Sequence, residues 1–301
     1  MAAWLHTSTA SAARRLSALT RQISTNKPRV ILGLMTFGPP GSEPNGARMT
    51  SLSDFKAFLD YFQGEGYAEI DTVRIYVDGK QEAFTRTDSI DIFYLHAPDR
   101  SIPFTKTLEA VNDLYSEGKF RQLGLSNYAA WEVSELWNIA NKREYVKPTV
   151  YQAMYNAITR DIDSELVPCC RKYGINIIAY NPLAGGALSG KYKSADIPSE
   201  GRFSSINDRQ GQLCRDRFFK DSTFEALRYI EPVVQKHNLT LVEVVFRWVI
   251  HHGLLKFNGV GEGGNDGILV GVGSLQQLKD NLDNIYKGPL PEEVVQTLGE
   301  A

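Results

Sequence analysis

The chain has few cysteines, no excess of charge of one sign and no long apolar run, and each shortage excludes a class of protein. Its three cysteines are Cys169, Cys170 and Cys214, and two of them are sequence neighbours, so neither a disulfide framework nor metal-ligand spacing is visible. A formal net charge of −2 provides no basic excess to bind nucleic acid. The apolar runs are interrupted well before the roughly 18 residues that a membrane span needs. We therefore expect a reducing compartment, with no metal, no nucleic-acid partner and no membrane span.

The first 26 residues lack acidic side chains, since the first one in the chain is Glu43. They are rich in Ser, Thr and Ala and contain Arg14, Arg15 and Arg21, a composition typical of transit peptides. We expect residues 1–26 to direct mitochondrial import; the alternative is a leader without an address on a cytoplasmic protein. Residues 27–301 are then the folded part, which is long enough for one large α/β domain.

Short β-branched or apolar runs alternate with longer segments of helical periodicity, a pattern typical of repeated βα units. Seven strands are predicted, at Val30–Gly33, Ala68–Asp71, Ile90–His96, Leu123–Ser126, Val150–Met154, Ile175–Tyr180 and Ile268–Gly271. Helices are predicted at 51–64, 108–118, Trp131–Asn141, Ile162–Tyr173, Phe224–His237, Leu241–His251 and Leu275–Leu282.

Two Gly-rich stretches between these elements are predicted to be loops. Residues 185–220 show little periodicity, and a loop of that length in a compact domain is usually functional or disordered. Gly259, Gly261 and Gly264 form a literal G-x-G-x-x-G, but a predicted helix precedes it and a strand follows it. This order is the reverse of a dinucleotide-binding turn, so a surface loop is expected there.

Seven segments, in this order along the chain, resemble the aldo-keto reductase family, and most closely its aflatoxin-aldehyde reductase-like branch. They are LMTFG, DTVRIYVDGKQE, DIFYLHAPD, GLSNYAAWEV, PTVYQAMYN, AYNPLAGGALSGKY and GVGSLQQLKDNL. The resemblance extends from about Arg29 to the last residue. It implies a TIM-type (β/α)8 barrel that reduces aldehydes and ketones with NADPH.

The resemblance also implies catalytic roles for three polar residues. Asp71 and Tyr76 match the family's D-x-x-x-x-Y motif, with Tyr76 as the proton donor, and His96 would orient the carbonyl oxygen. Carbonyl reduction does require a proton donor near the oxygen and stabilisation of its developing negative charge. The alternative is an N-cap role for Asp71 and core packing for the other two.

Further residues match the family's cofactor contacts. Ser126 and Asn127, with Gln152, would hold the nicotinamide amide, and Tyr180 would stack on the ring, although a helix N-cap and a buried strand tyrosine are the plain alternatives. The remaining predicted contacts are with the phosphates of the cofactor. The turn over the pyrophosphate would supply Asn181, Leu183, Gly185, Gly190 and Lys191. The helix that begins at the adenosine phosphate would supply Gly273, Ser274, Gln277 and Asn281.

Arg217 matches a substrate-contacting arginine, which implies that carboxylated carbonyl compounds could be accepted; a solvated salt-bridge arginine is the alternative. Cys214 occupies a position at which the resembling family branch has a tyrosine. Whether the protein forms a homodimer is left open.

One part of the family pattern is missing between Asp71 and Ile90. Only 18 residues separate them, whereas a βαβ unit needs about 30 or more. The family has a strand, a helix and a catalytic lysine here, and Lys80 lies too close to Tyr76 to replace that lysine, so we expect it to be solvated. We predict a barrel that lacks one strand–helix unit, lost between Thr85 and Arg86, and a C-terminal substrate loop missing after LGEA.

Without the lysine, Asp71 should raise the pKa of the Tyr76 phenol, because a nearby like charge opposes ionisation. A catalytically impaired NADPH-binding protein is therefore the alternative to an active reductase.

Overall fold

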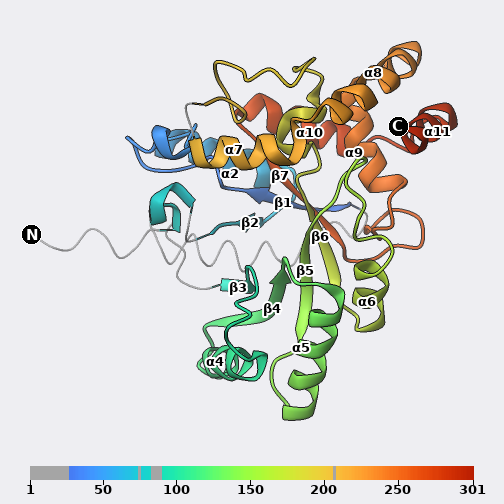
Figure 1. Ribbon diagram of the computed structural model, residues 1–301. Helices are drawn as coiled ribbons and strands as arrows, with labels where there is room; N and C mark the ends of the chain where they lie inside the picture. Colours follow the sequence, from blue (N-terminus) through green and yellow to red (C-terminus); the bar gives the residue numbers. More distant parts are fainter. Residues whose placement is uncertain (1–26, 74–75, 83–89, 206–207) are drawn as a thin grey trace, which may run out of the picture.

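The protein folds around one parallel sheet. The computed structural model describes residues 27–301 apart from 74–75, 83–89 and 206–207 (Figure 1). The leader and the expected break between Thr85 and Arg86 lie outside the described residues. The seven strands are β1 (Arg29–Gly33), β2 (Glu69–Asp71), β3 (Ile90–Leu95), β4 (Phe120–Ser126), β5 (Pro148–Met154), β6 (Asn176–Tyr180) and β7 (Gly267–Gly271).

The sheet is curled but not closed into a barrel. Its strand order is β2-β1-β7-β6-β5-β4-β3, and every neighbouring pair is parallel. Among the described residues, β2 pairs only with β1 and β3 pairs only with β4. The fold is therefore an α/β half-barrel, as a TIM-type barrel lacking one unit would be, and the opening lies between the two strands that flank the predicted gap.

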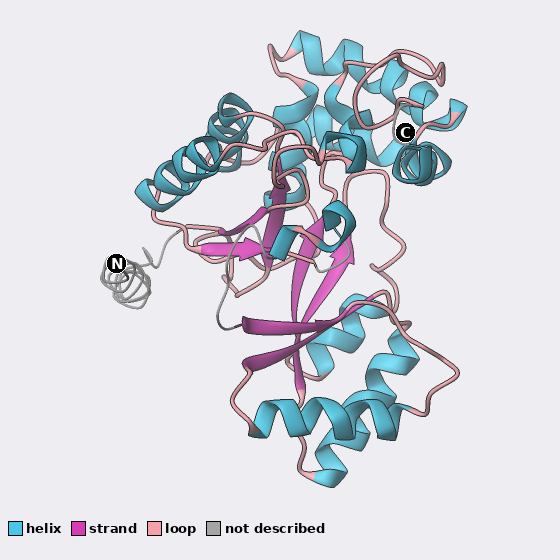
Figure 2. Cartoon of the chain, turned by 90° about the vertical axis from the view of Figure 1, so that its left-hand side faces the viewer, coloured by secondary structure: helices cyan, strands magenta, loops and turns pink. Residues whose placement is uncertain are grey.

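Helices cover the outside of this sheet in two groups (Figures 1 and 2). The α-helices are α2 (Leu52–Gly64), α4 (Phe104–Ser116), α5 (Ala130–Arg143), α6 (Leu166–Lys172), α7 (Asp208–Phe218), α8 (Asp221–Lys236), α9 (Leu241–His251), α10 (Leu275–Ile285) and α11 (Glu292–Glu300). The 3-10 turns are η1 (Glu43–Asn45), η2 (Tyr76–Gly79) and η3 (Ala184–Ser189). Within the described ranges, no helix has the length and apolar character to cross a membrane.

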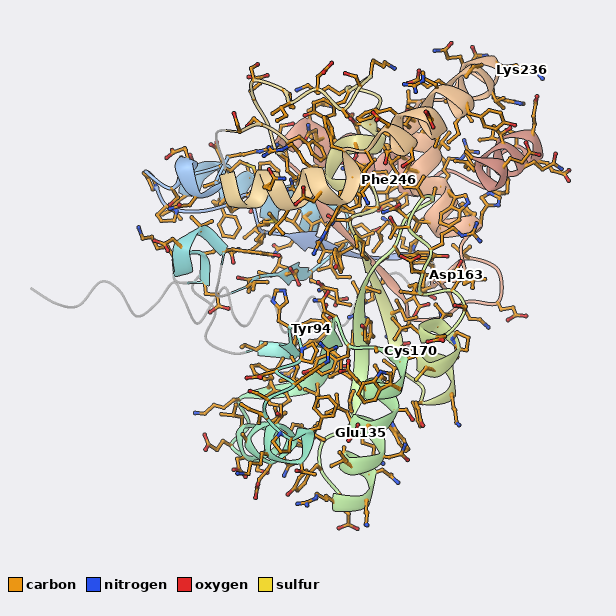
Figure 3. The ribbon with its side chains drawn as sticks, in the orientation of Figure 1. Tyr94, Glu135, Asp163, Cys170, Lys236 and Phe246 are labelled. Atoms are coloured by element: carbon orange, nitrogen blue, oxygen red, sulfur yellow. The ribbon has the colours of Figure 1, made fainter. Side chains whose placement is uncertain are left out.

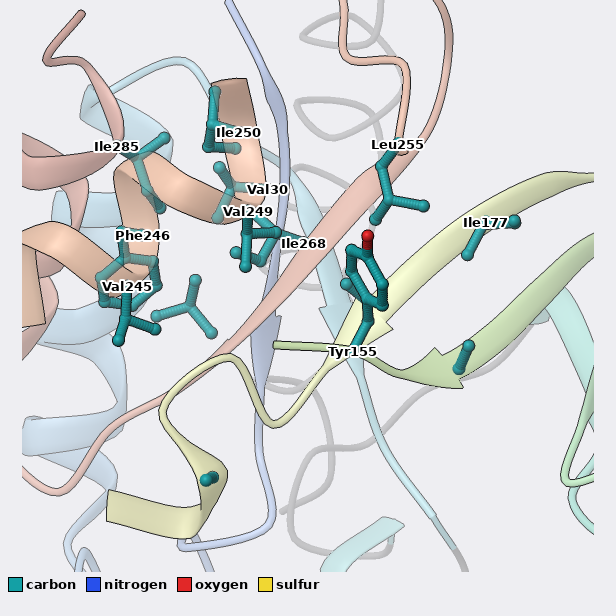
Figure 4. Close-up of a cluster of buried hydrophobic side chains, with 14 of the residues drawn as sticks. Val30, Tyr155, Ile177, Val245, Phe246, Val249, Ile250, Leu255, Ile268 and Ile285 are labelled. Carbon is teal, nitrogen blue, oxygen red and sulfur yellow. The ribbon is translucent and has the colours of Figure 1, made fainter. Parts of the chain in front are cut away.

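Two apolar clusters separate the inside of the half-barrel from the helix layer. Inside, Ile31, Val150 and Ile178 form a small cluster, with Ile92 and Tyr94 packed against it. The much larger second cluster joins strands to helices, where Val30 and Ile268 face α9 residues including Phe246 and Val249 (Figure 4). Because successive side chains of a strand point to opposite faces, this division shows which residues of each strand face inward.

Tyr155 anchors the end of β5 in the outer cluster (Figure 4). Its ring is fully buried, and its hydroxyl accepts a hydrogen bond from the Leu254 backbone N–H at 3.1 Å. Burial raises the pKa of this phenol to about 12, so it stays neutral. The nearby Gly253 leaves no room for a side chain, since a Cβ there would lie 2.9 Å from the Tyr155 ring.

All seven predicted strands are present, but two helices were not predicted. The segment 185–220, expected to be a loop, contains η3 and the eleven-residue α7, and α11 follows Pro291 near the C-terminus. The pattern failed for α7 because its sequence DRQGQLCRDRF has almost no apolar stripe. Helix α6 is also shorter than the predicted Ile162–Tyr173. The surface loop at Gly259–Gly264 is confirmed, between α9 and β7.

Candidate active site

Polar side chains gather where the parallel strands end. Asp71 is the last residue of β2, Ser126 of β4 and Tyr180 of β6, while His96 follows β3 directly. Asp71, His96, Gln152 and Tyr180 share the inward alternation of the small inner cluster. The carboxyl ends of parallel strands meet at one edge, so the chain brings these groups to the mouth of the half-barrel.

Asp71 is joined to Gln152 across the interior. The Gln152 side-chain Nε2 donates a hydrogen bond to Asp71 Oδ1 at 3.0 Å. Burial raises the pKa of the Asp71 carboxyl, while the bond from Gln152 and the charge of His96 oppose that rise. In the part of the chain that the structure describes, no Lys or Arg forms an ion pair with Asp71.

Tyr94 belongs to the same polar group, although sequence reasoning missed it. It lies on β3 beside the opening, labelled in Figure 3, and packs against the inner apolar cluster. Burial and the charge of Asp71 raise the pKa of its phenol, and Arg29 and a hydrogen bond with Gln152 lower it. Tyr94 lies two residues before His96 on the same strand, so its side chain points to the same face as that of His96. This spacing could have indicated that Tyr94 faces inward.

Tyr76 lies close to Asp71 and Tyr180, on the short turn η2. The pKa of its phenol is raised by burial first and then by the negative charge of Asp71 and by Tyr180, while Arg202 lowers it. The turn is tight, because Val77 and Asp78 both have positive φ, at 52° and 55°. Lys80 follows with an exposed side chain, as expected of a solvated lysine.

Three of the residues predicted at the nicotinamide, Ser126, Asn127 and Gln152, are joined by hydrogen bonds. Ser126 Oγ donates to the Gln152 carbonyl oxygen at 2.9 Å. Asn127 Nδ2 donates to the His96 carbonyl oxygen at 2.7 Å and to Ser126 Oγ at 3.1 Å. The positive φ of Asn127, 62°, turns the chain sharply at the end of β4. This places the Ser126–Asn127 pair beside Gln152 and His96.

The turn after β6 exposes backbone at positions that only glycine adopts easily. Gly185 and Gly190 have φ of 69° and 76°. Asn181 at the start of this turn has its carbonyl held by Asn156 Nδ2 at 3.0 Å. Leu183 is half-buried and packs against the outer cluster, while Lys191 is exposed at the far end. Such a run of turned backbone amides is a common way to bind phosphate.

The predicted second phosphate element is the start of α10. Ser274 caps the helix by accepting from the Gln277 backbone N–H at 3.2 Å. The Gln277 side chain accepts from the Gly273 N–H at 2.8 Å, so that amide is already used. Asn281, one turn further, is buried. The N-terminus of a helix favours an anion. Here, however, Gly273 and Gln277 are hydrogen-bonded to each other.

Two arginines that the sequence reading missed lie beside these elements. A Cβ at Gly273 would lie 3.1 Å from Arg48 Nη1, and a Cβ at Gly185 would lie 3.5 Å from Arg202 Cδ. Burial and the charge of Arg202 lower the pKa of Arg48, so the two guanidinium groups are close. Neither forms an ion pair within the described ranges. Both arginines lie in loops, and no local pattern in the sequence singles out either of them.

Arg217 and Cys214 lie on α7 near the same mouth. Arg217 is exposed, and its charge opposes the burial that raises the pKa of Tyr180 and of the Cys214 thiol. No acidic partner of Arg217 is present in the described chain. The structure therefore places Arg217 with Tyr180. No set of three His, Cys, Asp or Glu side chains that could hold a metal occurs among the described residues.

The chain is similar to known reductases over most of its length. The model of the aldo/keto reductase family matches residues 84–301. Aflatoxin B1 aldehyde reductase member 4 of Homo sapiens is 35% identical over 334 positions, covering 94% of this chain and 96% of the relative. Aflatoxin B1 aldehyde reductase member 2 of Mus musculus is 36% identical, covering 91% and 84%. An aldo-keto reductase of Pseudocercospora fijiensis is 42% identical over 217 residues, 71% of each chain.

The alignment with the human relative also has a gap in this chain. It spans 334 positions but 94% of the 301 residues, about 283 of them, so about 51 positions of the alignment have no residue here. That deficit is large enough to include a βαβ crossover, whose whole unit takes roughly 30 residues or more.

Proposed function

Because the chain belongs to the aldo/keto reductase family, in its aflatoxin-aldehyde reductase-like branch, we propose that it uses NADPH to reduce aldehydes or ketones to alcohols. The observation that carries the proposal is the meeting of Tyr76, Asp71 and Tyr180 beside His96 and Gln152 at the mouth of the half-barrel. Proton donor, oxygen-orienting group and aromatic surface are the parts that carbonyl reduction needs.

The residues present fit NADPH. Gly185 and Gly186 of η3 have positive φ, which only glycine adopts easily. A side chain at Gly273 would come within 3.1 Å of Arg48, so the space beside that arginine depends on glycine. Arg48 and Arg202 supply positive charge without an acidic partner among the described residues, which suits a phosphate. When bound, NADPH would supply the hydride.

Tyr76 would give its proton to the carbonyl oxygen, and His96 would hold that oxygen in place. Burial and Asp71 keep the phenol protonated, which preserves the proton but makes its release harder. Arg202 opposes this effect and is the one cation whose charge reaches Tyr76 among the described residues. We therefore expect slow catalysis.

A second candidate is an NADPH-binding protein without catalysis. The observation that favours it is the Gln152–Asp71 hydrogen bond, which occupies two groups predicted to contact the cofactor and the reacting centre. The other predicted cofactor contacts, beside a phenol whose pKa is raised, would then bind NADPH with little turnover.

The test combines binding and turnover on the full chain. NADPH fluorescence should change on binding, and an aromatic aldehyde should then accelerate NADPH oxidation, with Tyr76→Phe abolishing the acceleration. Binding without turnover supports the second candidate. Absence of binding contradicts both.

A further inference from the structure

Gln81, which lies five residues after Tyr76, is a buried amide that bonds to three other residues of the chain. Its side chain is shielded from solvent, at 0% exposure. Its Oε1 accepts hydrogen bonds from the Thr72 hydroxyl and, at 3.3 Å, from the Val73 backbone N–H. Its Nε2 donates to the Leu34 carbonyl oxygen at 3.1 Å. A buried polar group is costly unless it is hydrogen-bonded, so these bonds fix the amide in one place.

Two of these partners connect Gln81 to the backbone of the predicted proton donor. Val73 donates its N–H to Gln81, and its carbonyl oxygen accepts from the Tyr76 N–H at 3.0 Å. Thr72, the other partner, precedes Val73 directly. Gln81 therefore joins the chain before the turn η2 to the chain after it.

The third partner connects the same amide to the end of the sheet. The Leu34 N–H donates to the Asp71 carbonyl oxygen at 3.0 Å, and the Leu34 carbonyl oxygen accepts from Gln81. Leu34 follows the last residue of β1, and Asp71 is the last residue of β2. The base of η2 is thus tied to the two strands that place Asp71.

The turn that carries Tyr76 has a backbone conformation that needs such support. Val77, Asp78 and Gly79 all have positive φ, at 52°, 55° and 76°. Glycine adopts this region easily, but a β-branched residue such as valine does so rarely, because its Cβ comes too close to the backbone. Strained backbone of this kind persists only where the surrounding structure holds it.

Packing holds the tip of the turn from the other side. Val77 is 4% exposed, and a Cβ at Gly38 would lie 2.7 Å from Val77 Cγ1 and 3.3 Å from the Ala47 Cβ. The valine side chain therefore fills the space above Gly38. Packing fixes the tip of η2, and the bonds of Gln81 fix its base.

We propose that Gln81 is a positioning residue, whose amide holds the strained turn η2 so that the Tyr76 hydroxyl stays beside Asp71 at the mouth of the half-barrel. The inference rests on the proposed function, in which Tyr76 gives its proton to the carbonyl oxygen. Gln81 acts through the backbone of Val73 and Tyr76. Loss of its bonds lets η2 relax, and a misplacement of about 1 Å at a reacting group can cost about a hundredfold in rate.

The test compares Gln81→Met with a matched buried variant in the full chain. Gln81→Met removes the three bonds at similar side-chain length. The control is Asp266→Asn, because Asp266 is also buried and accepts from the backbone N–H groups of Ile177 and Lys256, but it lies before β7, at the opposite end of the strands.

We expect Gln81→Met to lower kcat about 10- to 100-fold, with the carbonyl KM and the NADPH affinity changed by less than about threefold. Asp266→Asn should lower the melting temperature and leave kcat of the folded protein unchanged. A residue that contributes to stability alone would behave as the control does.

A second readout follows Tyr76 without NADPH or substrate. Fluorotyrosine is placed at position 76, and its fluorine NMR resonance reports the surroundings of the phenol. Gln81→Met should shift or broaden this resonance, because the turn samples other conformations. Asp266→Asn should leave the resonance in place.

Gln81→Glu tests the hydrogen bonds through pH. When protonated, the new carboxyl group keeps an acceptor for Thr72 and Val73 and an O–H donor for Leu34. When ionised, it loses the donor and repels the Leu34 carbonyl oxygen, and burial raises the pKa at which this happens. The kcat of Gln81→Glu should therefore approach that of the unmodified chain in acid and show an added fall as pH rises.

The outcomes separate the positioning role from the proposed function. Unchanged kcat and an unmoved fluorine resonance in Gln81→Met, with a lower melting temperature, would show a structural role and overturn the proposal. If Gln81→Met does not fold, Thr72→Val, which removes one bond at similar volume, and Gln81→Glu decide: unchanged kcat in Thr72→Val and no added fall in Gln81→Glu overturn it. If the unmodified chain reduces no carbonyl, the proposed function fails, and an unmoved resonance in Gln81→Met would then overturn the positioning role separately.

Discussion

Gln152 donates its side-chain amide to the carboxylate of Asp71 over 3.0 Å, which joins β5 to β2 across the inside of the half-barrel. The bond satisfies a carboxyl group that burial makes costly to ionise. It also keeps Asp71 near Tyr76, whose phenol is harder to ionise as a result. The polar groups at the mouth of the sheet are therefore held in place by hydrogen bonds, and the raised pKa values of Asp71 and Tyr76 favour their protonated forms.

The first prediction concerns pH. Burial and Asp71 raise the pKa of Tyr76, so its phenol stays protonated in neutral and mildly alkaline solution. At pH values up to about 10, kcat/KM should therefore show no decrease caused by loss of that proton. Asp71→Asn removes the negative charge and should move the alkaline limb to lower pH. A pH profile of both proteins checks this, and identical limbs would contradict the contact between Asp71 and Tyr76.

The second prediction concerns Arg48 and Arg202, which form no ion pair with the described residues. Arg48→Gln or Arg202→Gln should weaken NADPH binding about 10- to 100-fold, since a charged hydrogen bond contributes about 1.5–3 kcal/mol. Fluorescence titration measures the loss of affinity for NADPH. The same titration with NADH, which lacks the extra phosphate, shows whether the loss depends on that phosphate. Arg121→Gln, an exposed arginine paired with Asp91 on the other half of the sheet, is the matched control. Equal effects of Arg48→Gln and Arg121→Gln would remove the phosphate role.

A third prediction concerns Asp266, a fully buried carboxylate before β7. It accepts two hydrogen bonds from the Arg171 guanidinium, and the backbone N–H groups of Ile177 and Lys256 donate to it at 2.6 and 2.7 Å. Asp266→Ala leaves the Arg171 charge unpaired and should lower the free energy of unfolding by about 3–5 kcal/mol. Urea unfolding measures this. Asp91→Ala, whose partner Arg121 is exposed, should change stability by less than about 1 kcal/mol.

The fourth prediction uses His252, which holds the start of α11. The Leu290 backbone N–H donates to His252 Nε2 at 2.8 Å, so the ring must be neutral at that nitrogen. Burial lowers the pKa of His252, and the charges of His251 and Arg247 add to the effect. As pH falls below about 6.5 the unfolded chain takes up a proton that the folded protein resists, so the free energy of unfolding decreases.

His252→Gln should flatten this pH dependence, because an amide oxygen still accepts the bond and does not titrate. Thermal melts between neutral pH and pH 5 measure the slope. His237→Gln, a histidine bonded to Glu293 on α11, is the control and should leave the contribution of His252 in place. An unchanged slope in His252→Gln would show that another group is responsible.

The strands could be predicted because runs such as VILG and IIAY are β-branched and bounded by Gly, Asn or Asp. Short spacing between Asp71 and Ile90 likewise predicted an open barrel, since a crossover needs a minimum length. Helix α7 could not be predicted, because its packing rests on Phe218 and the neighbouring aromatic residues rather than on an apolar stripe.

The candidate site was only partly visible in the sequence. Strand ends locate Asp71, His96 and Tyr180, but the Gln152–Asp71 bond links residues 81 positions apart and follows from the curl of the sheet. Arg48 and Arg202 come from two loops, and nothing local indicates that they meet. Pairings of this kind depend on tertiary structure.

The most direct measurement is carbonyl-dependent oxidation of NADPH by the full chain and by Tyr76→Phe, preceded by a fluorescence titration with NADPH. We predict saturable binding to both proteins and slow oxidation that the Tyr76→Phe change removes. A chain that binds no NADPH, or an oxidation rate that Tyr76→Phe leaves unchanged, would contradict reduction through this site.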